Sequence, residues 1–236
     1  NRCLAILAKK IFTAYPNVFH SQYVDKVFQL GNPLRQTLIK RSQEQKTARV
    51  AGSLRLLILG GSQGARVFNE HIPRVLQGVQ NKKSIIITHI AGKQGDLKQI
   101  HAMYAENRIQ ADVKEFIEDI ASCYMDVDFV IARAGALTVS ELMQFKLPAI
   151  LVPLPNSADN HQFYNALHYH QRGACWLVNQ DKLLQDNYLA NLINILLHSD
   201  KTITQMKAAT DRMQIASVAE KIIETMRNAE VTPARY

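Results

Sequence analysis

The sequence predicts an α/β protein with a doubly wound, Rossmann-like parallel sheet. Two observations support this fold class: short apolar runs recur along most of the chain, and helical patterns separate them. Strands that alternate with helices and are apolar throughout are typical of a parallel sheet with both faces covered. The expected strands are residues 54–59, 84–89, 112–116, 128–132, 149–152 and 175–178.

Apolar residues at helical spacing predict the helices between these strands. The expected helices centre on residues 65–78, 95–106, 137–145 and 160–171, and two further stretches, about 185–198 and 202–228, close the chain. We therefore assign residues 54–200 to the Rossmann-like domain and residues 201–236 to C-terminal helices.

The first 53 residues predict a different organisation. Apolar residues on one face predict an opening helix; they are Leu4, Leu7, Ala8, Ile11, Phe12 and Tyr15. A short extended segment at 26–30 then reaches Gly31-Asn32-Pro33, which breaks it. Residues 36–53 are polar with few large apolar groups, which predicts a linker between residues 1–35 and the α/β domain.

Composition and charge limit the classes of function that this protein can have. No apolar run approaches the roughly 20 residues that span a bilayer, and three cysteines without a CxxC favour neither a disulfide framework nor a zinc site. Residues 1–49 hold nine of the Lys and Arg residues against two acids, so most of the net charge of +8 lies there. Either an anionic partner or a solvated basic surface fits this asymmetry. Nucleic-acid binding is disfavoured, because no aromatic residues interleave with the basic ones in the way that base stacking requires.

Two glycine-containing loops follow strands and precede helices, where ligands of such sheets bind. The first loop is Gly60-Gly61-Ser62-Gln63-Gly64, and its glycines let a phosphate approach the backbone at a helix N-terminus. The second loop, 132–141, ends at Glu141, whose carboxylate suits the two hydroxyls of a ribose. Turn geometry for the first loop and a helix-dipole role for Glu141 remain the alternatives.

The polar segment 153–166 follows the fifth strand and suits the hydroxyls of a sugar, with Asp159 expected to cap its helix. Asp126 and Asp128 form a DxD spacing that can hold a metal, but they precede a strand and lie outside these loops. The histidines form no HExxH zinc motif. We therefore expect no resident metal and no cofactor.

Three motifs together resemble the MurG family of peptidoglycan glycosyltransferases: GGSQGAR, RAGALTVSE and PLPNSADNHQFYNA, with GNPLR and EFIED in matching positions. The resemblance covers residues 1 to about 227. It implies the donor-binding half of a GT-B fold and a hexosyltransferase reaction that inverts the sugar carbon. UDP-N-acetylglucosamine (UDP-GlcNAc) would be the donor and lipid I the acceptor, giving lipid II.

The resemblance also implies roles for individual residues. Arg35 would contact the donor, and Ser62 would bind its diphosphate beside the amides of Gly61 and Gln63. The backbone of Ile117 would meet the uracil, Glu141 the ribose and Gln162 the N-acetylglucosamine. The remaining donor contacts would come from the helix start, at Ala136, Leu137, Thr138, Val139 and Ser140. The family commonly has two glutamines where this sequence has His161-Gln162, so no role is assigned to His161.

Family members carry a preceding acceptor domain with its own glycine-rich loop, and no segment here matches that loop. Residues 1–35 are expected to be the end of that domain, which would supply the general base, and the last helix is expected to return to it. An alternative is a non-catalytic nucleotide-sugar module that acts with a partner chain. The resemblance implies a peripheral protein on the cytoplasmic face of the bacterial inner membrane. The basic residues Arg2, Lys9, Lys10 and their neighbours are expected to help hold it on anionic lipid.

Overall fold

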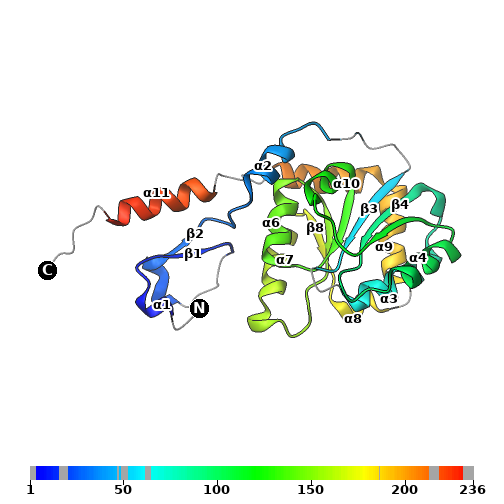
Figure 1. The fold of residues 1–236 in the computed structure, drawn as a ribbon, viewed down its shortest axis with the longest axis horizontal. Helices are drawn as coiled ribbons and strands as arrows, with labels where there is room; N and C mark the ends of the chain where they lie inside the picture. The colour runs from blue at the N-terminus through cyan, green and yellow to red at the C-terminus, as the bar shows by residue number, and fades with distance from the viewer. Residues whose placement is uncertain are drawn as a thin grey trace.

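The computed structural model describes residues 4–15, 21–46, 48, 53–61, 65–185, 187–212 and 218–230. The larger part is an α/β unit built on a six-stranded sheet (Figure 1). The N-terminal elements and the last helix, α11 (Val218–Glu230), project from this unit on the same side.

The six strands form the parallel sheet that the sequence predicts. They are β3 (Leu54–Leu59), β4 (Ile85–Ile90), β5 (Gln110–Lys114), β6 (Phe129–Ala132), β7 (Ala149–Leu151) and β8 (Cys175–Leu177). Their order is β5-β4-β3-β6-β7-β8, and every neighbouring pair is parallel. The fold class is therefore confirmed, and each strand ends within two residues of its predicted position.

Alternate residues of β3 belong to two separate cores, because successive side chains of a strand point to opposite faces. In β3, Leu56 and Ile58 pack with helices α3 (Arg66–Val75), α4 (Leu97–Glu106) and α9 (Tyr188–His198). Leu57, between them, joins the other core, with α5 (Ile120–Asp126), α6 (Ala136–Gln144) and α7 (His161–His170). Helices thus cover both faces, as apolar parallel strands require.

Five of these helices lie where the helical patterns predict them, but α5 and the short α8 (Gln180–Leu183) were not predicted. Short 3₁₀ turns complete the unit: η2 (Leu76–Gly78), η3 (Lys82–Ser84) and η4 (Ala158–Asn160). The stretch 202–228, predicted as one helix, contains two, α10 (Asp200–Asp211) and α11, and residues 213–217 between them lie outside the description.

The opening helix predicted over residues 4–15 is wrong beyond its first turn. Helix α1 (Leu4–Leu7) is followed by strand β1 (Ile11–Thr13), which pairs in parallel with β2 (Val27–Gln29) after the 3₁₀ helix η1 (Ser21–Lys26). The β-branched Ile11 and Thr13 favour an extended backbone. The extended segment predicted at 26–30 is confirmed by β2.

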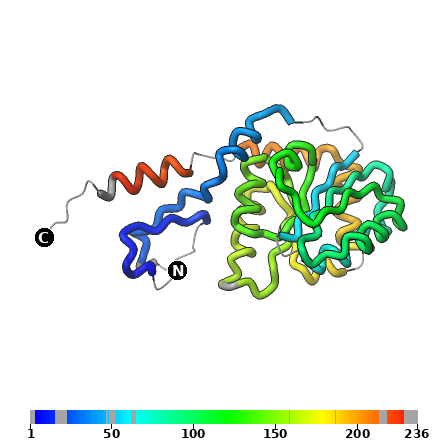
Figure 2. Tube along the Cα trace, in the orientation of Figure 1, coloured from blue at the N-terminus to red at the C-terminus, as the bar shows by residue number. Residues whose placement is uncertain are grey.

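The polar segment 36–53 is not wholly a linker, because α2 (Gln36–Ser42) forms at its start and packs on α5 and α6. Its Leu38 is buried in the core that those helices share. Further along, the Lys46 ammonium donates a hydrogen bond to the carbonyl of Phe145, which follows the last residue of α6. The trace of α2 leads from the N-terminal strands to the α/β unit (Figure 2).

Candidate donor-binding site

A cleft of about 1160 Å³ opens at the carboxyl edge of the sheet. It lies at the switch point between β3 and β6, where the strand order reverses and where ligands of doubly wound sheets bind. Helix α2 and the loop from β5 to α5 supply two of its walls. The floor comes from the ends of β3 and β4 and from the first turns of α6.

Six of the predicted site residues line this cleft together: Arg35, Gly61, Ile117, Leu137, Thr138 and Glu141. They come from four separate segments, and only the fold brings them together. Gly61 has a φ of +88° and an open surface beside it, so the turn after β3 needs a glycine there. The phosphate-binding residues expected next, Ser62, Gln63 and Gly64, lie outside the described residues.

Other predicted site residues lie outside the lining of the cleft. Gly60 is buried at the end of β3, and Val139 is fully buried in the core that faces α6. The Val139 N–H is also taken, since it donates to the carbonyl of Gly135 (2.9 Å). The structure thus provides neither the side chain nor the amide of Val139 for a ligand.

The Ser140 hydroxyl and the Ala136 carbonyl bind the N-terminal segment, and neither residue is part of the cleft lining. The Asn32 amide donates to the Ala136 carbonyl (3.0 Å) and to the Ser140 hydroxyl (2.9 Å). The Tyr15 hydroxyl donates to the same carbonyl (3.1 Å) and shares a hydrogen bond with Ser140 (3.2 Å). These bonds fix the first turn of α6 against the strands that precede it in the chain.

Gln162 stabilises a loop in this structure. Its Oε1 accepts a hydrogen bond from the Leu154 N–H (2.9 Å), and the residue does not line the cleft. The expected cap of α7 is also wrong, because the N-cap is Asn160, which makes no side-chain capping bond, and Asp159 lies in η4. Both residues have a positive φ of 51°, which the short polar side chains of Asn and Asp tolerate.

Glu141 is the titratable group whose environment is most informative. Its carboxylate accepts a hydrogen bond from the Tyr124 hydroxyl at 2.9 Å. Burial raises the pKa of Glu141, while the Tyr124 hydrogen bond and the nearby Arg35 charge lower it. A carboxylate has acceptor sites on both oxygens, so one phenol leaves others for a ligand.

The N-terminus of α6 reaches the cleft without a side-chain cap. Gly135 is the N-cap residue and has no side chain to accept from the first-turn amides. Those amides and the positive end of the helix dipole favour an anion. This arrangement suits a phosphate at the cleft end of α6.

Arg133 adds a cation that was not predicted. Its guanidinium donates to neutral oxygens of Val152 and Pro153 (each 3.3 Å) and of Gln180 (2.6 Å), and it stacks on the ring of Phe68 (4.8 Å). Burial lowers its pKa from the usual arginine value, but guanidinium remains charged. Arg133 thus brings a fixed positive charge to the switch point.

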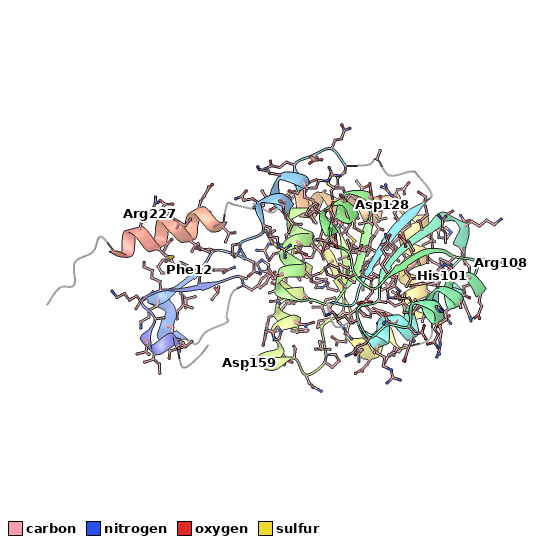
Figure 3. All side chains as sticks on the ribbon, viewed as in Figure 1. Phe12, His101, Arg108, Asp128, Asp159 and Arg227 are labelled. Carbon is pink, nitrogen blue, oxygen red and sulfur yellow. The ribbon has the colours of Figure 1, made fainter. Side chains whose placement is uncertain are left out.

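Asp128, the second acid of the DxD pattern, has a structural role. Asp128 is 1% exposed and binds Arg55 through both carboxylate oxygens, at 2.9 Å and 3.1 Å. It also accepts from the Arg55 amide (3.0 Å). Asp128 lies at the opposite end of the α/β unit from Asp159 (Figure 3). Within the described ranges, no three His, Cys, Asp or Glu side chains gather as a metal site would need.

The architecture defines the class of the protein. A parallel sheet with helices on both faces and a cleft at its switch point is a doubly wound, Rossmann-like domain, the kind of domain from which GT-B glycosyltransferases are built. The chain belongs to glycosyltransferase family 28: the family's C-terminal domain matches residues 55–223.

Individual relatives agree with this assignment. The chain is 35% identical over 231 residues to a Thiobacillus denitrificans protein named UDP-N-acetylglucosamine–N-acetylmuramyl-(pentapeptide) pyrophosphoryl-undecaprenol N-acetylglucosamine transferase, covering 94% of this chain. A Coxiella burnetii protein of the same name is 36% identical over 210 residues, covering 89% of this chain. In both cases the chain spans 58% of the relative's length.

A solved structure shows the same resemblance. The crystal structure of MurG from Acinetobacter baumannii superposes with a TM-score of 0.74 at 28% identity, over 97% of this chain and 62% of that one. The resemblance to the MurG family that the motifs indicate is therefore confirmed.

Proposed function

We propose that this chain is the donor-binding part of a hexosyltransferase that moves N-acetylglucosamine from UDP-GlcNAc to a lipid-linked muramyl-pentapeptide acceptor. The observation that carries the proposal is that Arg35, Ile117 and Glu141 line one cleft, although they lie far apart in the sequence. The names of the relatives support the same donor and acceptor.

The nucleoside and diphosphate parts of a UDP-sugar have suitable partners in or beside the cleft. The backbone at Ile117 can pair with a uracil edge, and the partly buried Glu141 carboxylate can accept two ribose hydroxyls. The diphosphate would lie between the N-terminus of α6 and the loop after Gly61, with Arg133 nearby. Gln162 would reach the sugar only if its amide released the Leu154 N–H or used its own N–H groups.

The proposed chemistry divides between this chain and the rest of a full-length enzyme. As the bond from the anomeric carbon to the phosphate oxygen breaks, negative charge develops on the UDP leaving group. Helix N-termini and fixed cations that face this charge stabilise the transition state. A general base that takes the proton of the acceptor hydroxyl is expected in the part of the relatives that this chain does not span.

Calorimetric titration with UDP-GlcNAc, UDP, ADP and GDP tests the proposal. We expect both uridine ligands to bind at least about tenfold more tightly than the purine diphosphates, a difference of about 1.4 kcal/mol. Such a preference follows because a backbone edge that pairs with uracil does not match a purine. Equal affinity for all four ligands, or no binding of UDP, would contradict donor binding.

We also propose that the N-terminal segment helps to hold the protein on an anionic membrane, at the cytoplasmic face of the bacterial inner membrane. Large apolar side chains are exposed there beside Lys9, Lys10 and Lys26; they are Leu4, Ile6, Leu7 and Val24, each at least 66% exposed. None of the described helices is long and apolar enough to cross a bilayer. Surface attachment would need both the basic and the apolar side chains.

Vesicle sedimentation tests this attachment. Replacing Lys9 and Lys10 with glutamine is expected to weaken binding to anionic vesicles by about 2 kcal/mol, because each basic residue near the surface contributes about 1 kcal/mol. The same change at Lys82 and Lys83, in η3 of the α/β unit, is the matched control. Salt should reduce the wild-type binding. Equal binding of the wild type to neutral and anionic vesicles at low salt would contradict the proposal.

A further inference from the structure

Tyr124 and Glu141 form a hydrogen-bonded pair that reaches from the core to the cleft. Tyr124 lies on α5 and is 1% exposed, and its hydroxyl donates to Oε2 of Glu141 at 2.9 Å. Glu141 lies on α6 and is partly exposed, and both residues line the cleft. This hydrogen bond joins α5 to the side chain on α6 that is proposed to bind the ribose.

The core fixes the position of the tyrosine. Its ring packs on Phe145 with centroids 5.1 Å apart, and both rings belong to the core beneath α6. Burial, together with the charge of Glu141, raises the pKa of Tyr124 well above its usual value. The phenol therefore keeps its proton at neutral pH and acts as a constant donor.

We propose that Tyr124 is a positioning residue for donor recognition, which holds the Glu141 carboxylate in the orientation that two vicinal ribose hydroxyls require. The inference rests on the proposed function, since it concerns the same ligand. One oxygen of the carboxylate is anchored from below, and the remaining acceptor sites are available to the ligand. Preorganisation of this kind lowers the entropy cost of binding.

The hydrogen bond also affects the ionisation of the carboxyl group. Burial raises the pKa of Glu141, and the Tyr124 hydroxyl and the Arg35 charge oppose that rise. Other charged side chains line the same cleft; they are Arg41, Lys93, Glu115, Glu118, Asp119 and Arg133. Without the Tyr124 hydroxyl, one of the two effects that lower the pKa of Glu141 is lost. The Glu141 carboxyl group should therefore take up its proton at a higher pH.

The test is Tyr124→Phe, measured by calorimetric titration with UDP from mildly acidic to neutral pH. The ring is retained, so packing on Phe145 should persist. We expect UDP affinity at neutral pH to fall roughly three- to tenfold, the fold-change that corresponds to the usual net contribution of one hydrogen bond. We also expect the pH at which affinity falls to move upward, because UDP requires the ionised carboxylate.

Tyr169→Phe is the matched control. Tyr169 is equally buried in the same core, but its hydroxyl donates to the backbone carbonyl of Leu147 (2.8 Å). This variant should leave both the affinity and its pH dependence unchanged. If Tyr124→Phe lowers affinity without moving the pH dependence, its effect is one of packing and the inference is overturned. Unchanged affinity overturns it as well.

A second measurement separates this inference from the proposed function. The Glu141 carboxyl can be followed in the free protein by carbon-13 NMR of labelled glutamate, with its signal assigned from Glu141→Gln. Tyr124→Phe should raise its titration midpoint, and Tyr169→Phe should not. If wild-type protein fails to bind UDP, the proposed function fails, and this titration still decides whether Tyr124 controls Glu141. If Tyr124→Phe leaves the titration midpoint of Glu141 unchanged, the inference is overturned, whether or not the protein binds UDP.

Discussion

Glu141→Ala is expected to lower UDP affinity by about 2–3 kcal/mol, because it removes two hydrogen bonds from ribose hydroxyls to a charged acceptor. The carboxylate lies in the cleft, and the Tyr124 hydroxyl already orients it. Calorimetric titration measures the loss. Gln144→Ala, on the same helix but outside the cleft lining, should change UDP affinity little.

The ionisation of Glu141 should also make UDP binding depend on pH. UDP needs the ionised carboxylate, so affinity should fall as pH decreases through the pKa of Glu141 in the free protein. Burial raises that pKa above the ordinary 4.5, so the fall should begin at a higher pH than for an exposed glutamate. In Glu141→Ala this pH dependence should disappear. Unchanged affinity in a folded variant would instead favour a helix-dipole role for this carboxylate.

The sheet could be predicted from sequence because apolar parallel strands give a strong and repeated signal. Leu54–Leu59 is apolar on both faces except for Arg55, whose charge is paired with Asp128. Short elements were harder to predict. Helix α5 has only seven residues, and its start signal, Asp119 accepting from the Ser122 amide, is one of many Asp-x-x-Ser spacings in proteins.

The cleft was predictable in part for the same reason. Gly61, Thr138 and Glu141 follow strands in recognisable motifs, so their place at the carboxyl edge follows from the fold. The contribution of Tyr124 depends on α5, and no local pattern joins it to a residue 17 positions later. Likewise, Asn32 and Tyr15 contact α6 only through tertiary structure, so the sequence did not show that Ser140 faces them.

Transfer of N-acetylglucosamine to a lipid-linked acceptor is expected to require more than this chain. The cleft offers groups for the nucleotide and the leaving diphosphate, but transfer also needs a base within hydrogen-bond reach of the acceptor hydroxyl. It needs the acceptor held in line with the sugar carbon as well. Because the chain spans 58% of its relatives' length, we expect both to come from the remaining part of such an enzyme.

The measurement compares conversion of lipid I to lipid II by this chain alone and by the chain joined to the N-terminal half of a relative. We expect the joined protein to be faster by at least about 10²–10⁴-fold, the contribution of general acid–base catalysis alone. UDP affinity should be similar in both, which separates donor binding from chemistry. Glu141→Ala in the joined protein should lose activity, because transfer still depends on the donor site. Transfer by this chain alone at a comparable rate would show that the general base lies within residues 1–236 and that the division of roles is wrong.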